Sequence, residues 1–315
     1  MLVLHNIHQK KKLKSSIFEK NERRITLSFY KYFNVHNPNQ LRNTVYEKFF
    51  QLNIFGRIYI AYEGINAQIN ILKKKLYLLK NTLYKINHSL KNVHLNYALN
   101  QKTSFWMLKV KVRKKIVADG LPNTFIYNNN TGTYLEIHDV NRMLKQSNTI
   151  FVDMRNDYEY LVGRFKHAIH IPGSTFRAQL QIIVNFLKQY QNKHIVMYCT
   201  GGIRCEKAAA WLKYHHFKYV YQIRGGILNY VNESRKNNFL IQFHGKNFVF
   251  DDRMTEKISE HILSKCKNCN DYCDTYLNCQ KHTCHRLFIQ CRICQIKYNG
   301  YCSKFCKSHS INQLK

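Results

Sequence analysis

A cysteine stands between an apolar run and a helical pattern. Residues 194–198 read His-Ile-Val-Met-Tyr, which is typical of a buried strand, and a helical pattern begins at residue 203. Between them lie Cys199 and a glycine pair, Gly201 and Gly202. Loop amides and the positive end of the helix would point toward the sulfur, so they favour a thiolate and would hold a persulfide equally well. The glycines let the backbone fold closely around that sulfur. The pattern predicts a nucleophile; the alternative is an inert buried cysteine beside a turn.

Two further residues of this loop have candidate catalytic roles. Four residues separate Cys199 from Arg204, which is the loop length of rhodanese sulfurtransferases, whereas related phosphatases use a loop one residue longer. The spacing therefore favours sulfur chemistry over phosphate hydrolysis. We expect Arg204 to pair with an anionic substrate or intermediate; the alternative is an arginine tied to a nearby carboxylate. Cys205 would lie on the first helical turn, where it either resolves an oxidised or persulfidated Cys199 or packs the helix against the sheet.

A charged pair follows another apolar run. Asp153 and Arg155 come directly after residues 149–152, so they lie at a strand end near the predicted site. An ion pair that shapes the loop is favoured here over proton transfer. We expect both residues, together with the glycine pair of the cysteine loop, to support the site.

The C-terminal end is rich in cysteine. Nine of the 11 cysteines fall between residues 266 and 306, with histidines interspersed. The nine are Cys266, Cys269, Cys273, Cys279, Cys284, Cys291, Cys294, Cys302 and Cys306. Two cysteines with two residues between them can bind one tetrahedral ion from a tight turn. These residues therefore predict structural zinc in up to two four-ligand sites, with an iron–sulfur cluster as the alternative. The spacing leaves open which cysteines share an ion.

The composition indicates a globular chain with a polyanionic partner. Lys and Arg number 50 against 18 Asp and Glu, a net charge of +32, and 45% of the residues are hydrophobic. This balance suggests nucleic acid or an acidic membrane surface, although an AT-rich genome would produce part of the lysine excess. No apolar run approaches the roughly 18 residues of a membrane span or the core of a secretory signal. We therefore expect a cytoplasmic protein with no membrane partner.

The first half of the chain predicts a ferredoxin-like domain. Its pattern is strand, helix, strand, strand, helix, strand at residues 25–33, 38–53, 57–61, 66–70, 72–86 and 93–99. A further strand at residues 105–112 puts Lys109, Lys111 and Arg113 on one face. These are candidate RNA-binding residues, and Tyr59, Tyr62 and Trp106 are candidate base-stacking neighbours. The alternative is an ordinary solvated strand face.

Alternating strands and helices from residue 149 onward predict a parallel, doubly wound sheet. The expected fold class is thus α/β, with an N-terminal ferredoxin-like α+β domain, a central rhodanese-like sheet and a small metal module. The expected divisions are a basic segment 1–24, the ferredoxin-like domain 25–113, a connector 114–147, the rhodanese domain 148–240 and the cysteine-rich module 241–315.

Several motifs of the second half resemble a rhodanese domain. They are Asp153-Met154-Arg155, Gly163 to Ala168, Ile171-Pro172, the Cys199 loop and Gly225-Gly226. Arg164 and His167 depart from the usual rhodanese sequence pattern, at positions away from the sulfur loop.

The whole chain resembles the bacterial tRNA uridine hydroxylase family. The resemblance rests on Ser28 to Tyr32, Gly64 to Gln68, Lys111 to Arg113, Tyr198 to Ala208, Gly245 to Asp251 and the cysteine-rich end. It implies formation of 5-hydroxyuridine at the wobble position of tRNA, with dioxygen as co-substrate and the anticodon region as the bound part. Cys199 matches the family's reactive cysteine.

Two other functions fit the residues. One is a persulfide sulfurtransferase that acts on a thiol or on tRNA, and the other is a non-catalytic, zinc-stabilised RNA-binding protein. The sequence contains no flavin, haem or nicotinamide motif, and it does not indicate an oligomeric state.

Overall fold

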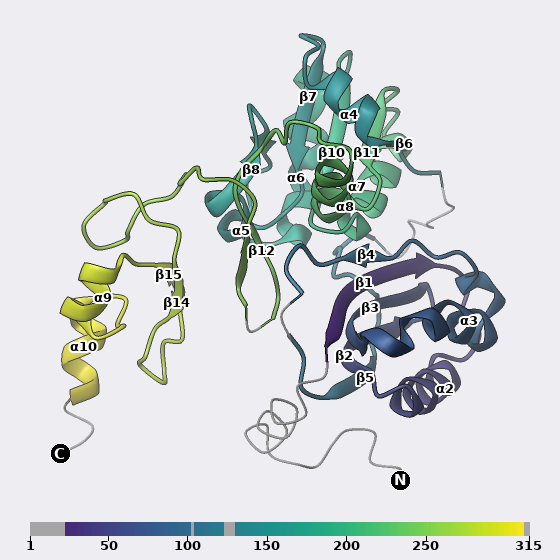
Figure 1. The fold of residues 1–315 in the computed structure, drawn as a ribbon. Helices are drawn as coiled ribbons and strands as arrows, with labels where there is room; N and C mark the ends of the chain where they lie inside the picture. Colours follow the sequence, from purple (N-terminus) through teal and green to yellow (C-terminus); the bar gives the residue numbers. More distant parts are fainter. Residues whose placement is uncertain (1–22, 102–103, 123–129, 252, 312–315) are drawn as a thin grey trace.

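The computed structural model describes residues 23–101, 104–122, 130–251 and 253–311 (Figure 1). The predicted basic segment lies almost entirely outside these residues. An N-terminal α+β domain packs against a central parallel-sheet domain, and the cysteine-rich end, coloured yellow-green to yellow, lies to one side of both. No described helix has the length and apolar character needed to cross a membrane.

The N-terminal domain has the predicted ferredoxin-like order of elements. They are β1 (Arg24–Tyr32), α2 (Pro38–Gln51), β2 (Phe55–Ala61), β3 (Gly64–Leu72), η1 (Lys73–Lys75), α3 (Leu76–Ile86), η2 (His88–Leu90), β4 (Asn96–Tyr97) and β5 (Leu108–Val112). The sheet order is β4-β1-β3-β2-β5, and β5 adds to the edge parallel to β2. The predicted strand at 93–99 is reduced to β4.

The two faces of this sheet differ in chemistry. Alternate residues such as Leu27, Phe29 and Ile69 form an apolar face, and α2 and α3 cover it with side chains that include Val45 and Leu83. The opposite face is polar, because the residues between them in β1 and β3 are hydroxyl and amide side chains. These are Ser28, Tyr30, Asn66 and Gln68. A sheet with one apolar and one polar face needs only one layer of helices.

The second domain is a parallel sheet with helices on both faces, as predicted. Its elements are β6 (Thr133–Leu135), α4 (Ile137–Met143), β7 (Thr149–Asp153), α5 (Asp157–Val162), β8 (Gly163–Phe165), β9 (Ile169–His170), α6 (Phe176–Leu187), η3 (Lys188–Tyr190), β10 (His194–Tyr198), α7 (Ile203–Tyr214), β11 (Val220–Ile223) and α8 (Gly226–Lys236). The order is β6-β11-β10-β7-β9. One apolar core joins α6 and α7 to the sheet, and another joins α4 and α8.

The expected connector 114–147 needs correction. β6 pairs in parallel with β11, so the second sheet begins before residue 148, where the sequence pattern placed its start. Three residues are too short a run to show a strand period.

The C-terminal region is anchored on the second domain. Its elements are β12 (Phe243–Phe248), β13 (Thr255–Lys257), β14 (Tyr276–Asn278), β15 (Leu287–Ile289), α9 (Arg292–Tyr298) and α10 (Lys304–Ile311). β12 pairs with β8, with Phe243 opposite Phe165, so the expected module 241–315 does not begin as a separate unit. Most of the cysteines lie in the loops around the two-stranded β14-β15 ribbon, and Cys294 and Cys306 lie in α9 and α10.

Helix α7 holds the two main domains together. Lys207 Nζ lies 2.5 Å from Glu63 Oε2 of the N-terminal domain and 3.5 Å from Asp119 Oδ2. The preceding residue, Glu206, accepts a hydrogen bond of 3.3 Å from Tyr30 Oη. Lys207 and Asp119 side chains are 4% and 0% exposed, so water does not screen their attraction strongly.

We expect Lys207→Met to destabilise the protein by about 3 kcal/mol, because Glu63 loses its cation and the buried Asp119 keeps only Lys115. Chemical denaturation of the whole chain measures this effect. Lys236→Met is the matched control, since Lys236 is 74% exposed and its pair with Glu233 spans 3.9 Å. An equal loss in both variants would show that the Lys207 cluster does not hold the domains together.

Candidate active site and metal clusters

The loop after β10 encloses the sulfur of Cys199. Cys199 is 1% exposed, and Gly202 N donates a hydrogen bond of 3.1 Å to its Sγ. Gly202 has φ +99°, a conformation that glycine adopts without strain. The start of α8 contacts this loop: Ile227 N donates a hydrogen bond of 3.0 Å to Cys199 O. The sulfur is therefore held by backbone donors from a rigid loop.

The charge of this sulfur is set by opposing effects. Burial raises the pKa of Cys199, but the Cys205 thiol, the Arg204 guanidinium and loop N–H groups stabilise the anion and lower its pKa to about 5. Burial and the neighbouring sulfur raise the pKa of Cys205 well above its ordinary value. At neutral pH, Cys199 is a thiolate and Cys205 is the thiol that donates to it.

Arg204 is tied to a carboxylate of the same domain. Its Nη1 lies 2.6 Å from Glu159 Oε2, and its Nη2 lies 2.9 Å from Glu159 Oε1. Glu159 is 0% exposed, and its Oε2 also accepts from Asn156 N at 3.0 Å. Arg204 is therefore paired with a carboxylate, and its expected pairing with an anionic substrate or intermediate stays a prediction. Sequence reasoning missed Glu159, although Asn156 three residues before it is a capping-box signal at the start of a helix.

Asp153 and Arg155 form the expected ion pair. Arg155 Nη2 lies 2.6 Å from Asp153 Oδ2, and both side chains are 0% exposed. Arg155 also donates to Gly163 O, which ties the end of β7 to β8. The pair fixes the strand ends behind the sulfur loop.

A cavity of about 500 Å³ opens beside the sulfur. The N-terminal sheet, the sulfur loop, the start of α6 and the segment after β12 all line it. Its lining includes Ser28, Tyr30, Asn66, Gln68, Val117, Asn156, Phe176, Arg177, Cys199, Thr200, Gly201, Arg204 and Phe250. The site therefore belongs to the interface between domains.

The glycine pair has a second structural use beyond the one expected. A Cβ on Gly202 would lie 2.9 Å from Tyr30 Oη, and one on Gly201 would lie 3.5 Å from Asn96 Nδ2. Asn96 Nδ2 donates to Gly201 O at 3.1 Å. The absence of a side chain at Gly202 thus lets Tyr30 of the N-terminal sheet lie directly on the sulfur loop, whereas a Cβ at Gly201 would make only an ordinary contact.

The candidate RNA-binding residues lie on the same sheet face as the cavity wall. Strand register aligns Lys109 with Arg57, Arg57 with Gln68, and Gln68 with Ser28. A second row joins Lys111, Tyr59, Asn66 and Tyr30 in the same way. Directly paired residues share a face, so both rows run from the basic sheet edge into the cavity.

The aromatic neighbours of this edge differ in accessibility. The Arg113 guanidinium lies 5.6 Å from the centre of the Tyr59 ring, on the row that leads to the cavity. Tyr62 is 67% exposed. Trp106 is 5% exposed, so its expected role in base stacking is wrong: the ring packs in the protein instead.

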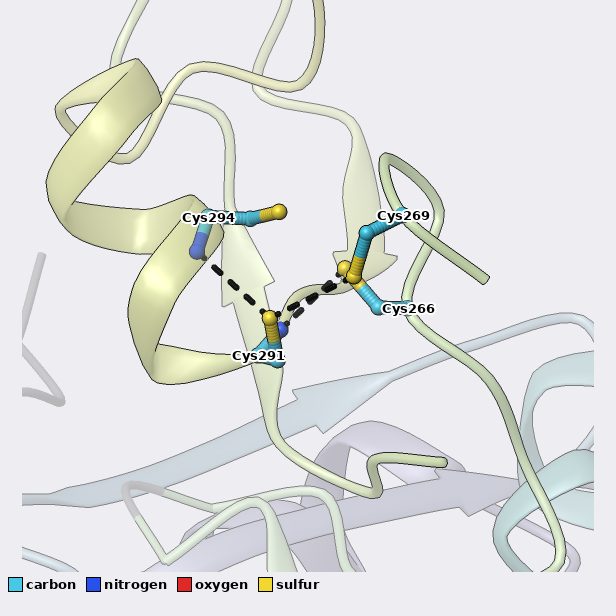
Figure 2. A group of neighbouring side chains, drawn as sticks. All are labelled: Cys266, Cys269, Cys291 and Cys294. Carbon is cyan, nitrogen blue, oxygen red and sulfur yellow. Dashed lines mark hydrogen bonds between the residues drawn. The ribbon is translucent and has the colours of Figure 1, made fainter. Parts of the chain in front are cut away.

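Eight of the nine clustered cysteines form two groups of four. The first contains Cys266, Cys269, Cys291 and Cys294, whose sulfurs converge in Figure 2. The second contains Cys279, Cys284, Cys302 and Cys306. Within each group the sulfurs lie within 4.8 Å of one another. Cys273 belongs to neither group, so its expected role as a ligand needs correction.

The sulfur spacing fits a tetrahedral ion. Zn–S bonds of about 2.3 Å put neighbouring sulfurs about 3.8 Å apart. Cys269 and Cys291 sulfurs are 3.6 Å apart, and Cys284 and Cys302 sulfurs are 3.9 Å apart. The ligand pairs alternate along the chain between the first and second groups. Each group of four therefore joins two chain segments, and a cysteine pair of the other group lies between those two segments in the sequence.

Comparison with known proteins covers nearly the whole chain. The UPF0176 acylphosphatase-like domain model matches residues 24–116, the rhodanese-like domain model matches 136–233, and the rhodanese C-terminal model matches 244–307. The tRNA uridine(34) hydroxylase of Buchnera aphidicola subsp. Baizongia pistaciae (strain Bp) is 53% identical over 97% of this chain and 98% of its own length. That of Enterobacter sp. (strain 638) is 46% identical over 99% of this chain and 89% of its own. With its site built from the same three matched regions, the chain belongs to the tRNA uridine(34) hydroxylase family.

Proposed function

We propose that this protein converts uridine 34, the wobble base of tRNA, to 5-hydroxyuridine, with Cys199 as its nucleophile. The observation that carries the proposal is that Cys199, with its pKa lowered to about 5, lines an interdomain cavity whose polar wall continues into a basic sheet edge. The names of the relatives support the substrate and the reaction. Dioxygen is the co-substrate: one oxygen atom enters the base at C5 and the other leaves as water, while two thiols supply the two electrons and become a disulfide. The cytoplasm, where tRNA is found, is the setting.

The loop residues have distinct roles in this proposal. The target pyrimidine enters the cavity beside the Cys199 sulfur. The positive charge of Arg204, which Glu159 holds in place, keeps that sulfur anionic. Cys205 donates to the thiolate and is the nearby thiol that resolves an oxidised Cys199. Asp153 and Arg155 position the loop and do not transfer protons, because both are occupied by each other.

The basic sheet edge binds the anticodon region. Lys109 and Lys111 are exposed, and Arg113 lies against Tyr59 on the same face. Cations at this edge hold the phosphates, while the wobble base leaves its stack and enters the cavity. Phosphate contacts of this kind position the RNA without reading its sequence.

Zinc is the ion that the two cysteine groups would hold. Four thiolates form a closed site, which stabilises a small module and leaves no open position for substrate. Zinc therefore contributes folding free energy to the C-terminal end and takes no part in the reaction.

The proposed reaction is tested with purified protein, a thiol reductant and unmodified tRNA. Under oxygen, wild-type protein is expected to form 5-hydroxyuridine, detected by nucleoside mass spectrometry, and under nitrogen it is not. Cys199→Ser should abolish the product because the hydroxyl is not ionised at neutral pH. Cys273→Ser is the control at a cysteine outside the cavity and both metal groups.

Other outcomes distinguish the competing functions. Persulfide transfer that depends on Cys199, without any 5-hydroxyuridine, would instead indicate a sulfurtransferase. Tight tRNA binding with neither activity would indicate a non-catalytic RNA-binding protein.

Metal content tests the two cysteine groups separately. We expect two zinc ions per chain, and Cys291→Ser or Cys302→Ser should each remove one ion and lower the midpoint of thermal unfolding. Cys273→Ser should keep both. Elemental analysis of the purified variants measures this directly, and full occupancy in Cys291→Ser would contradict the assignment.

A further inference from the structure

The polar row of the N-terminal sheet ends at the cavity in an unpartnered pair. Ser28 and Gln68 lie directly opposite each other on β1 and β3, and both line the Cys199 cavity. Both are half-buried. Among the residues that the structure describes, neither side chain has a hydrogen-bond partner. Both side chains are therefore available to hydrogen-bond a ligand that enters the cavity in place of water.

The chemistry of this pair matches the edge of a uracil. A glutamine amide offers a donor and an acceptor side by side, and uracil offers O4 as an acceptor beside N3–H as a donor. The Ser28 hydroxyl can either donate or accept a hydrogen bond. One amide therefore forms two hydrogen bonds with the base, and the hydroxyl adds a third.

An aromatic side chain from a different part of the chain faces the same cavity. Phe250, in the segment after β12, is 38% exposed and lines the cavity together with Gln68 and Cys199. Its ring lies edge-on to Phe248 at 5.4 Å between centroids, so a packed neighbour holds it in place. Exposed aromatic faces bind unstacked bases.

We propose that Ser28 and Gln68 hydrogen-bond the polar edge of the target uracil while Phe250 stacks on its face. The inference rests on the proposed function and names the groups that hold the flipped base. Arg57 pairs directly with Gln68, and Lys109 lies one strand further along the same row. Neighbouring strands are about 4.8 Å apart. Phosphate contacts and base contacts therefore lie along one sheet face, with the sulfur at its end.

RNA binding tests this inference without turnover. In a Cys199→Ser background, the probe is an unmodified anticodon stem-loop with uridine at position 34, compared with one that is abasic there. We expect Gln68→Leu to weaken binding of the uridine RNA about tenfold and to leave the abasic RNA unchanged. Gln51→Leu, the same change at the exposed end of α2, should alter neither.

A charge variant gives the sharper result. Gln68→Glu keeps an acceptor for uracil N3–H but places a carboxylate oxygen against uracil O4, where the amide had a donor. We expect this variant to bind the uridine-34 stem-loop more weakly than Gln68→Leu does, when each is measured relative to the abasic stem-loop. Ser28→Ala, expected to weaken uridine binding more mildly, covers the case in which a Gln68 variant fails to fold.

The outcomes separate this inference from the proposed function. Unchanged uridine binding in Gln68→Leu and Ser28→Ala overturns the inference, even when the wild-type protein forms 5-hydroxyuridine. Loss of uridine binding in these variants supports it, even when the wild-type protein forms no product and the proposed function fails.

Discussion

A buried negative charge on sulfur is the constraint around which the structure is built. Taking a thiolate out of water is unfavourable unless nearby donors and positive charge compensate for the lost hydration. Gly202 N–H, the Cys205 thiol and the Arg204 guanidinium supply that compensation. Arg204 is itself buried and needs Glu159, which in turn is held at the start of α5. The Cys199 thiolate therefore depends on Arg204, and the buried Arg204 depends in turn on Glu159.

The same helix that presents the sulfur also binds the neighbouring domain. Arg204 contacts its own domain, whereas Glu206 and Lys207 reach Tyr30 and Glu63 of the N-terminal sheet. Consecutive residues of one motif thus fix both the charge of the nucleophile and the wall opposite it. The N-terminal sheet covers the sulfur loop on this side and leaves a cavity beside the sulfur.

Local patterns in the sequence were sufficient for much of this structure. The period of apolar residues identified both sheets, and the cysteine loop indicated its own chemistry, because strand, glycine turn and helix are adjacent in the chain. Glu159 and Glu63 were missed because they lie 45 and 144 residues from their partners. β6 was missed because its three residues gain their conformation from pairing with β11. Cysteine spacing predicted metal sites, but only the fold shows that Cys273 is excluded and that the ligand pairs alternate.

The thiolate of Cys199 can be titrated directly. The ultraviolet absorbance of thiolates is followed against pH in the wild-type protein and in Cys199→Ser, and the difference isolates this one sulfur. A sulfur stabilised as described ionises with a midpoint near the pKa of about 5 and stays anionic through neutral pH. A midpoint at the ordinary cysteine value of about 8.5 would contradict the account.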